Sequence, residues 1–314
     1  MDAFIGNIFN HDAELVDYVR KLFGYAINGH TREDIFVLLL GAGGNGKGAL
    51  KEMLQAVVGD YYGTMSKDAV VTAPGQKASS KNAPTNHIYE LMGVRLAVTD
   101  ETAEEDQVDL GIVLAMTGSG TTKARCLHTN NVEFTVTHTP FVQTNYPPAI
   151  CATAIKDNVE RRLRAIPFPN TYVDANAFDP TNVTHRLRDN HLKERMKEEE
   201  SRRQILSWLA RGSVEWYDSA EGLGSPPKAV KDATDEYLRE ADKLQMFIDQ
   251  HCEVGEGLST LQAEFAACYG QYSSKRISYE ELRRRMDTKG FKRAKNNDSP
   301  RQFYYPGIRC SYAI

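Results

Sequence analysis

Cysteine is scarce in this sequence, and no arrangement of cysteines indicates a disulfide framework or a metal site. The five cysteines lie at positions 126, 151, 252, 268 and 310, without a Cys-x-x-Cys pair and without metal-ligand spacing to the eight histidines. This usage is typical of reduced thiols in a cytosolic-type protein. No basic segment followed by an apolar one opens the chain, so no secretory signal is visible. Because the longest hydrophobic run is far too short to cross a bilayer, we predict no membrane partner and a cytoplasmic location.

The chain as a whole also has no strong excess of charge of one sign. Its net charge of −4 argues against a protein that coats nucleic acid with its entire surface. Between Ser274 and Arg309, however, eleven Lys and Arg residues stand against four Asp and Glu residues, so this segment is about +7 and the remainder about −11. A basic C-terminal unit on an acidic body indicates a module that contacts a phosphate backbone. A solvated charged helix is the alternative interpretation.

A glycine-rich segment behind an apolar run is the most informative feature that is present. It follows the strand-like residues 35–40 and precedes a helical apolar pattern over 50–58. Glycines allow backbone N–H groups to surround phosphate oxygens, and Lys47 adds a positive charge between the β- and γ-phosphates. The pattern predicts a nucleotide-binding loop made of Gly41, Ala42, Gly43, Gly44, Asn45, Gly46, Lys47, Gly48 and Ala49.

This loop departs from the usual pattern at one position. A Ser or Thr normally follows the lysine, and its hydroxyl binds Mg²⁺. Here the residue is Gly48, and no hydroxyl follows nearby. Phosphate binding should persist because the cradle is mostly backbone, but the metal must depend on another carboxylate or on water.

Nucleotide hydrolysis needs further groups, and three later segments supply candidates. Asp100 and Glu101 follow the apolar run 96–99, where Asp100 would hold hydrated Mg²⁺ and Glu101 would orient or deprotonate the attacking water. Asn145 follows the run 141–144 and could reach the γ-phosphate or the water, although a turn asparagine is the alternative interpretation. Arg161 and Arg162 precede a further strand and could stabilise transition-state charge in a neighbouring subunit, although a solvated basic cluster is an equally good interpretation.

Strand-like runs alternate with helical patterns between about residues 35 and 168, which predicts an α/β core with a parallel sheet. The strand candidates are 35–40, 96–99, 141–144 and 164–168, and a helix is expected at about 12–25. A charged, mostly helical stretch is expected over 186–203, and the Gly- and Pro-rich residues 222–227 form the clearest linker. We predict four parts: a helical N-terminal segment at 1–34, the nucleotide-binding core at 35–171, a helical segment with linker at 172–228 and a C-terminal domain at 229–314.

Residues 229–314 show three helical patterns followed by a hairpin. Apolar residues repeat at helical spacing over 230–248 and 261–269, and a third helix is expected from Ser278, as its N-cap, to about Lys289, with Gly290 beyond its end. The runs 291–294 and 302–305 flank a polar turn at 296–298. This order describes a winged helix. Its candidate DNA-binding cations lie on the third helix and the wing, at Arg283, Arg284, Arg285, Lys292, Arg293, Lys295 and Arg301.

Taken together, these motifs resemble the superfamily III (AAA+) DNA helicases of viruses, phages and mobile elements, in the poxvirus-like and satellite-phage-like primase–helicase branch. The loop 41–47 is similar to Walker A, Asp100-Glu101 to Walker B, and Asn145 to the sensor-1 asparagine. Arg162, with Arg161 as the second choice, stands where this family has its arginine finger. Residues 117–125 are similar to the B′ motif, which in the family runs into a channel hairpin, here about 124–129 and 132–137. Lys123, Arg125 and His128 would then contact the translocating DNA strand.

The resemblance implies an ATP- and Mg²⁺-dependent ring helicase, which is expected to form homo-oligomers, as hexamers. It would translocate 3′→5′ on single-stranded DNA, unwind forked duplexes and act in the host cell cytoplasm. Residues 1–34 would be the helical collar, and a primase or primase–polymerase module would act in cis or in trans. The alternatives are an ATP-binding replication initiator with weak hydrolysis, and a phosphate-loop kinase, although we find no Arg-rich lid after the core.

Overall fold

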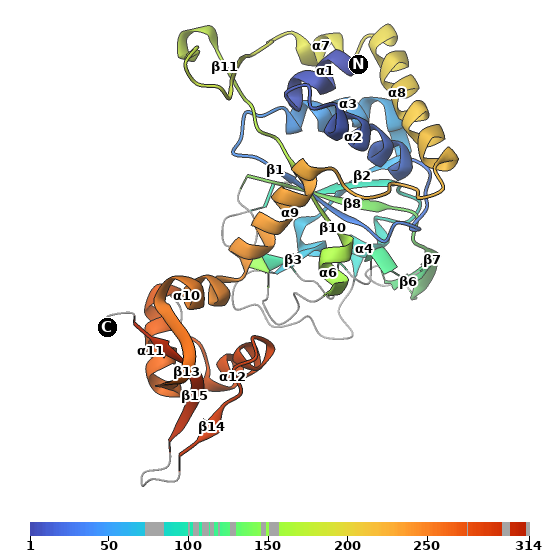
Figure 1. The fold of residues 1–314 in the computed structure, drawn as a ribbon. Coiled ribbons are helices and arrows are strands. Elements are labelled where there is room, and N and C mark those ends of the chain that lie inside the picture. The colour runs from blue at the N-terminus through green and yellow to red at the C-terminus, as the bar shows by residue number, and fades with distance from the viewer. Residues whose placement is uncertain are drawn as a thin grey trace. The chain divides into compact units, whose positions relative to one another are not determined.

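The computed structural model describes residues 1–72, 85–99, 101–102, 107–108, 113, 116–118, 120–125, 130–145, 149–150, 157–274, 276–296 and 302–311. The chain forms two compact units (Figure 1). The larger unit consists of Met1–Ala149 with Asp157–Asp235, and the smaller of Ile150–Lys156 with Glu236–Ile314.

A five-stranded parallel sheet forms the centre of the larger unit. Its order is β10-β1-β8-β4-β2, and every neighbouring pair is parallel. The predicted parallel α/β core is therefore confirmed, and four of the strands match the predicted runs, whereas β2 was not predicted. The strands are β1 (Phe36–Leu40), β2 (Tyr62–Met65), β4 (Leu96–Thr99), β8 (Thr139–Thr144) and β10 (Leu163–Pro167).

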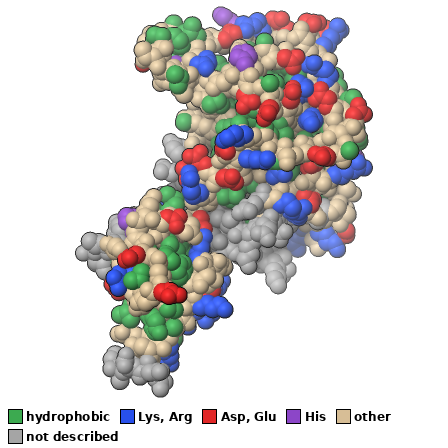
Figure 2. Space-filling model, in the orientation of Figure 1, with side chains coloured by type: hydrophobic (Ala, Val, Ile, Leu, Met, Phe, Trp, Pro, Cys, Tyr) green, Lys and Arg blue, Asp and Glu red, His purple; other side chains and the backbone are tan. Residues whose placement is uncertain are grey.

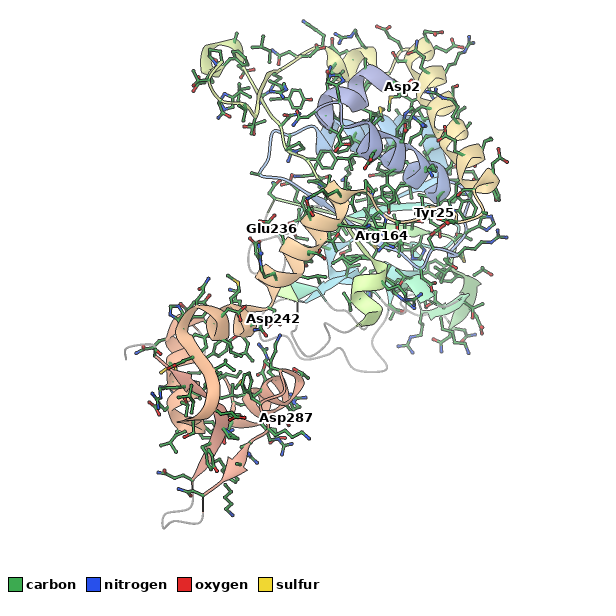
Figure 3. The ribbon with its side chains drawn as sticks, in the orientation of Figure 1. Asp2, Tyr25, Arg164, Glu236, Asp242 and Asp287 are labelled. Carbon is green, nitrogen blue, oxygen red and sulfur yellow. The ribbon has the colours of Figure 1, made fainter. Side chains whose placement is uncertain are left out.

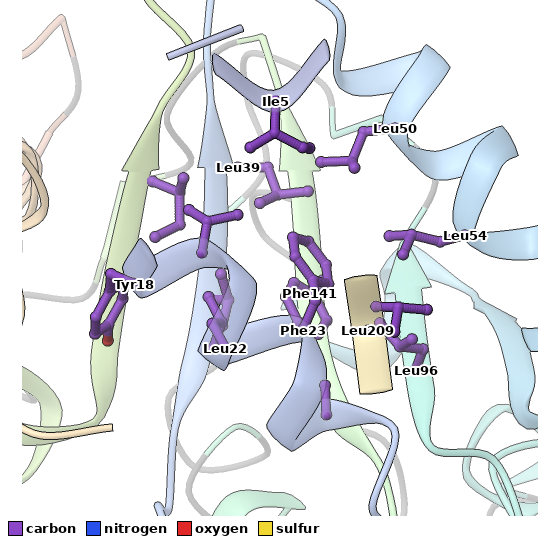
Figure 4. Close-up of a cluster of buried hydrophobic side chains, with 14 of the residues drawn as sticks. Ile5, Tyr18, Leu22, Phe23, Leu39, Leu50, Leu54, Leu96, Phe141 and Leu209 are labelled. Atoms are coloured by element: carbon purple, nitrogen blue, oxygen red, sulfur yellow. The ribbon is translucent and has the colours of Figure 1, made fainter. Parts of the chain in front are cut away.

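Helices cover this sheet with a continuous apolar core (Figure 4). Phe23 stacks on Phe141 of β8 with ring centroids 5.0 Å apart, and Trp208 lies fully buried beside them. Gly24 and Gly212 lie where two helices meet, and a Cβ on either would come within about 2.2 Å of the other helix's backbone. The close approach therefore requires glycine at both positions. The helices are α1 (Asp2–Ile8), α2 (Ala13–Ala26), α3 (Lys47–Val58) and α8 (Glu199–Asp218).

Ion pairs add polar links around this core. Arg20 Nε lies 2.9 Å from Glu215 Oε2, which joins α2 to α8. Arg211 Nη2 lies 2.9 Å from Asp2 Oδ2, and Asp2 is marked on α1 in Figure 3. Figure 2 shows Lys and Arg side chains interspersed with Asp and Glu on the visible face of this unit. Within the part of the chain that the structure describes, we find no helix long and apolar enough for a membrane span.

Short elements connect the strands, and two sequence predictions differ from them in part. The predicted hairpin exists, but its first strand starts at Thr121 rather than Ala124, and residues 126–129 lie outside the described part. The stretch 186–203 contains a strand and two helices rather than mostly helix. These elements are η1 (Gly59–Tyr61), η2 (Lys67–Ala69), β3 (Val71–Thr72), α4 (Asn86–Tyr89), β5 (Gln107–Val108), β6 (Thr121–Ala124), β7 (Val132–Thr135), β9 (Ala149–Ile150), α6 (Asp157–Arg162), β11 (Thr171–Val173), η4 (Ala175–Ala177), β12 (His185–Leu187) and α7 (Leu192–Arg195).

The helical repeat predicted over 230–248 is interrupted at Asp242. The Asp242 carboxylate accepts a hydrogen bond from the Gln245 backbone N–H, so a new helix begins there (Figure 3). The predicted third helix is confirmed, because Ser278 Oγ accepts from the Glu281 N–H at 3.2 Å and Gly290 follows with φ +86°. The helices are α9 (Lys228–Ala241), α10 (Lys243–His251), α11 (Gln262–Tyr272) and α12 (Tyr279–Thr288).

A three-stranded antiparallel sheet, in the order β13-β15-β14, completes the smaller unit. Its long first strand was missed, because a register shift between Val254 and Ser259 interrupts its alternation. Buried side chains of α10, α11, α12 and β15 form a separate core, in which Phe247 and Phe265 meet edge to face with ring centroids 5.4 Å apart. The strands are β13 (Cys252–Leu261), β14 (Ala294–Lys295) and β15 (Phe303–Cys310).

Candidate functional site

The glycine-rich loop joins the end of β1 to the start of α3, as the sequence predicts. Gly43, Gly44 and Gly46 have φ values of +94°, +59° and +93°, which residues with a side chain rarely adopt. Gly41 is required for space, because a Cβ there would lie 1.8 Å from Nδ2 of the buried Asn45. The loop therefore presents backbone rather than side chains to the space in front of it.

Lys47 begins α3 and points back across this loop. Its side chain is buried, and its Nζ donates to Gly41 O at 2.6 Å and to Asn145 Oδ1 at 3.0 Å. Burial lowers the pKa of Lys47 to about 8, and the nearby Glu101 carboxylate partly opposes this shift. The ammonium group is thus held at the loop without a direct contact to a carboxylate among the described residues.

Two amide side chains hold Glu101, and one of them, Asn145, also contacts Lys47. Asn145 Nδ2 donates to Glu101 Oε2 at 2.9 Å, and Gln143 Nε2 donates to Glu101 Oε1 at 3.2 Å. The order of the sheet explains this meeting, because β8 lies between β1 and β4. The carboxyl ends of three neighbouring parallel strands therefore bring the loop, the amides and the carboxylate together.

The sequence analysis missed Gln143, although a signal for it exists. Gln143 lies in β8 two residues before Asn145, which directly follows the strand, and strand alternation directs residues two apart to the same face. Asp100, which the sequence analysis paired with Glu101, lies outside the described residues.

A cavity of about 690 Å³ lies in front of the loop, within the larger unit. Glu101, Gln143 and Asn145 line one end, and Ala3, Phe4 and Asn7 of α1 line another part. A third wall comes from the segment that runs from Tyr172 in β11 to Arg195 in α7. The sequence analysis did not include this segment in the site. The size is within the range of small-molecule sites. Gly48 lines the cavity, and a Cβ there would have no atom within 4 Å.

The two candidate trans-acting arginines differ in their surroundings. Arg162 is held within its own unit, because Nη1 donates to Thr117 Oγ1 at 2.9 Å and Nη2 lies 3.7 Å from Asp34 Oδ2. Its side chain is 15% exposed, whereas that of Arg161 is 60% exposed and lies 3.8 Å from the same carboxylate. Arg162 thus ties the B′-like residues 117–118 to the start of β10, and Arg161 faces outward.

The candidate DNA-binding residues of the larger unit lie on and beside the β6–β7 hairpin. Lys123 is exposed and lies 3.4 Å from Glu133 on the opposite strand. Arg125 is half-buried, and its backbone N–H donates to Thr85 Oγ1 at 2.9 Å. His128 lies outside the described residues.

The basic residues of the smaller unit are partly committed to neighbours. Arg283 pairs with Glu280 at 2.8 Å, and Arg284 is exposed on the same helix. Lys292 is exposed, and the Arg293 guanidinium lies 3.9 Å from the centroid of the Phe303 ring. The unit therefore presents basic and aromatic groups at its β14–β15 hairpin, with Arg301 outside the described residues.

Comparison with known proteins leads to viral helicases, although no family model matches the chain. The chain is 29% identical over 162 residues to the candidate helicase L207/L206 of Acanthamoeba polyphaga mimivirus, which covers 52% of this chain and 16% of that protein. It is 22% identical over 255 residues to the candidate helicase 022R of Frog virus 3 (isolate Goorha), over 79% of this chain and 25% of that protein. The chain thus spans a quarter or less of each of these relatives.

A solved structure supplies the fold comparison. The C-terminal region of NrS-1 in an apo form superposes with a TM-score of 0.53 at 10% identity, covering 97% of this chain and 74% of that one. At this identity the likeness concerns the fold alone. The viral relatives together with this fold support a viral helicase-type protein.

Proposed function

We propose that this chain is the ATP-hydrolysing motor part of a viral-type DNA helicase of superfamily III, with an AAA+ core and a C-terminal winged helix. The observation that carries the proposal is the chain of contacts from Gly41 through Lys47 and Asn145 to Glu101, in front of a phosphate loop. A cation for phosphates and a carboxylate for water thus lie at one cavity, which is the arrangement that nucleotide hydrolysis needs.

In this proposal the bound triphosphate draws the Lys47 ammonium away from Asn145. The Asn145 amide and Glu101 are then free to orient a water molecule. Glu101 accepts a proton from this water as its oxygen attacks the γ-phosphorus, and the bond from the γ-phosphorus to the β–γ bridging oxygen breaks, which releases ADP and phosphate. Mg²⁺ would neutralise phosphate charge when bound, and Glu101, with Asp100 by resemblance, would hold it or its water ligands, while Gly48 leaves space in the cavity and supplies no side-chain ligand. Gln143 keeps the carboxylate in position through its amide.

The ring-forming part of the proposal concerns a site shared between subunits. The exposed Arg161 would reach the neighbour's phosphates, while the partly buried Arg162 would hold the strand and the B′-like segment in place. The hairpin would carry Lys123 and Arg125 to the translocating strand, and the exposed Arg284 and Lys292, with the half-buried Arg293, would contact duplex DNA.

DNA-stimulated ATP hydrolysis, measured against protein concentration, tests this function. We expect turnover per subunit to rise with concentration and the assembled protein to open a tailed duplex with Mg-ATP. Arg161→Ala should keep ATP binding but lose turnover, and mixing with Lys47→Ala should restore part of it. A protein that hydrolyses ATP independently of concentration and opens no duplex would contradict the motor and favour the initiator.

Gly48→Ser is expected to lower the Mg²⁺ concentration that supports half-maximal hydrolysis, by about tenfold if the new hydroxyl adds about 1.4 kcal/mol of metal binding. The open space at Gly48 accommodates the side chain without strain. Gly48→Ala is the matched control, because it adds the same Cβ without the hydroxyl. Both variants should gain a few tenths of a kcal/mol of helix stability, measured by thermal unfolding. Equal Mg²⁺ dependence in the two variants would show that the missing hydroxyl has no role here.

A further inference from the structure

The third wall of the cavity is attached directly to the phosphate loop. The Tyr172 backbone N–H, in β11, donates to Gly44 O at 2.6 Å. The chain returns as β12, parallel to β11, and the Arg188 N–H donates to Val173 O at 2.8 Å. Beyond it, α7 packs against α3, and Lys193 pairs with Glu52 of that helix. The segment 171–195 is therefore attached to the loop at its first end and to α3 at its last end (β11, α7 and α3 are labelled in Figure 1).

Three cations of this wall line the cavity, and each is paired with a carboxylate. Lys193 is bound to Glu52, and Arg195 contacts both oxygens of Asp189. Arg188 Nη1 lies 3.3 and 3.4 Å from the Asp174 oxygens, and both side chains are about half exposed. An exposed pair with such long contacts contributes little, so Arg188 can leave Asp174 at small cost. Arg188 differs from the other two cations because its Nη2 also donates to the backbone of β11, at Tyr172 O.

We propose that Arg188 binds the phosphate groups of the nucleotide in its own subunit, exchanging the Asp174 carboxylate for phosphate. The inference rests on the proposed nucleotide site. Arg188 Nη2 donates to Tyr172 O at 3.2 Å, and the backbone N–H of Tyr172 donates to Gly44 O of the loop. A single residue, Tyr172, thus links the Arg188 guanidinium to the loop backbone that would surround the phosphates. The planar guanidinium matches the geometry of phosphate oxygens. The ligand class is a nucleoside di- or triphosphate, in preference to a monophosphate.

Binding of ATP, ADP and AMP to the full chain, followed by calorimetry or by fluorescent analogues, tests this assignment. Arg188→Ala is expected to weaken ATP and ADP binding by about 10–100-fold, as for loss of a charged hydrogen bond, and AMP binding far less. Asp174→Asn removes the competing carboxylate, so it should tighten ATP binding severalfold. A purely structural Arg188–Asp174 pair would instead make both variants bind more weakly.

Arg186→Ala is the matched control, because Arg186 lies in β12 two residues before Arg188, but its Nη2 donates to Asn10 Oδ1 and it does not line the cavity. It should bind all three nucleotides like the wild type. Wild-type affinity retained in Arg188→Ala, or an equal loss for AMP and ATP, would overturn the role of Arg188 while the site stands. If the wild type binds no nucleotide, the proposed function fails first, and the inference fails with it.

Discussion

Replacing Glu101 by Gln is expected to lower ATP turnover by about 10²–10⁴-fold while ATP binding stays within about twofold of the wild type. The carboxylate accepts hydrogen bonds from Gln143 and Asn145 and still has lone pairs for the proton of water. A glutamine cannot take that proton, and its NH₂ group must face one of the two amide donors. Affinity should persist, because the loop and Lys47 are untouched and a negative charge near the phosphates is removed.

Single-turnover hydrolysis and equilibrium nucleotide binding together measure this effect. Glu90→Gln is the matched control, since Glu90 is an exposed carboxylate in the turn that leads into β4, the strand before Glu101. That variant should hydrolyse ATP at the wild-type rate. Normal turnover by Glu101→Gln would remove Glu101 from the water-activating role and with it the central step of the proposed mechanism.

The parts of the site that the sequence predicted are those that local patterns encode. Glycines at 43, 44 and 46 are needed for local φ values, and the apolar run before them is a buried strand whatever its neighbours are. Glu101 and Asn145 follow such runs, so the common edge of a parallel sheet brings them to the loop. These inferences need only strand ends and not the strand order.

The parts that were missed depend on which strands become neighbours. Gln143 is an ordinary strand residue until β8 is placed between β1 and β4, where its amide meets Glu101. Arg188 is distant in sequence from every motif, and only the return of the chain from β11 to β12 brings it to the cavity. The end of one helix and the start of the next at Asp242 could not be predicted either, because the apolar residues on both sides keep helical spacing across the two helices.

The same distinction applies to the paired arginines. Arg161 and Arg162 are adjacent and equivalent in sequence, yet Arg162 contacts Thr117 and Asp34 while Arg161 is largely exposed. The difference arises because Thr117 Oγ1 accepts a hydrogen bond from Arg162 at 2.9 Å, whereas, among the described residues, Arg161 pairs only with the Asp34 carboxylate, at 3.8 Å. An alanine at Arg162 thus changes packing inside one subunit, which is why Arg161 is the more informative position for a shared site.

Lys47→Ala is expected to weaken ATP binding by about 100-fold or more and to abolish hydrolysis, since it removes the only cation held directly at the described part of the loop. The wild-type affinity should also depend on pH in a defined direction. Burial lowers the pKa of Lys47 to about 8 in the free protein, whereas bound phosphates favour the charged form. Binding is therefore strongest below about pH 8 and should fall as pH rises through that value, by at most about tenfold per pH unit.

Titrations of ATP binding between about pH 7 and about pH 9.5 test this linkage, because the triphosphate itself changes little in that range. Lys47→Arg is the discriminating control, since a guanidinium stays charged throughout and its variant should show no loss above about pH 8. Lys47→Ala should bind weakly with no slope. A slope that persists in both variants would assign the titration to another group. If the ATP affinity of the wild type does not change with pH, Lys47 keeps its proton throughout this range although it is buried. Burial would then not limit its binding of phosphates.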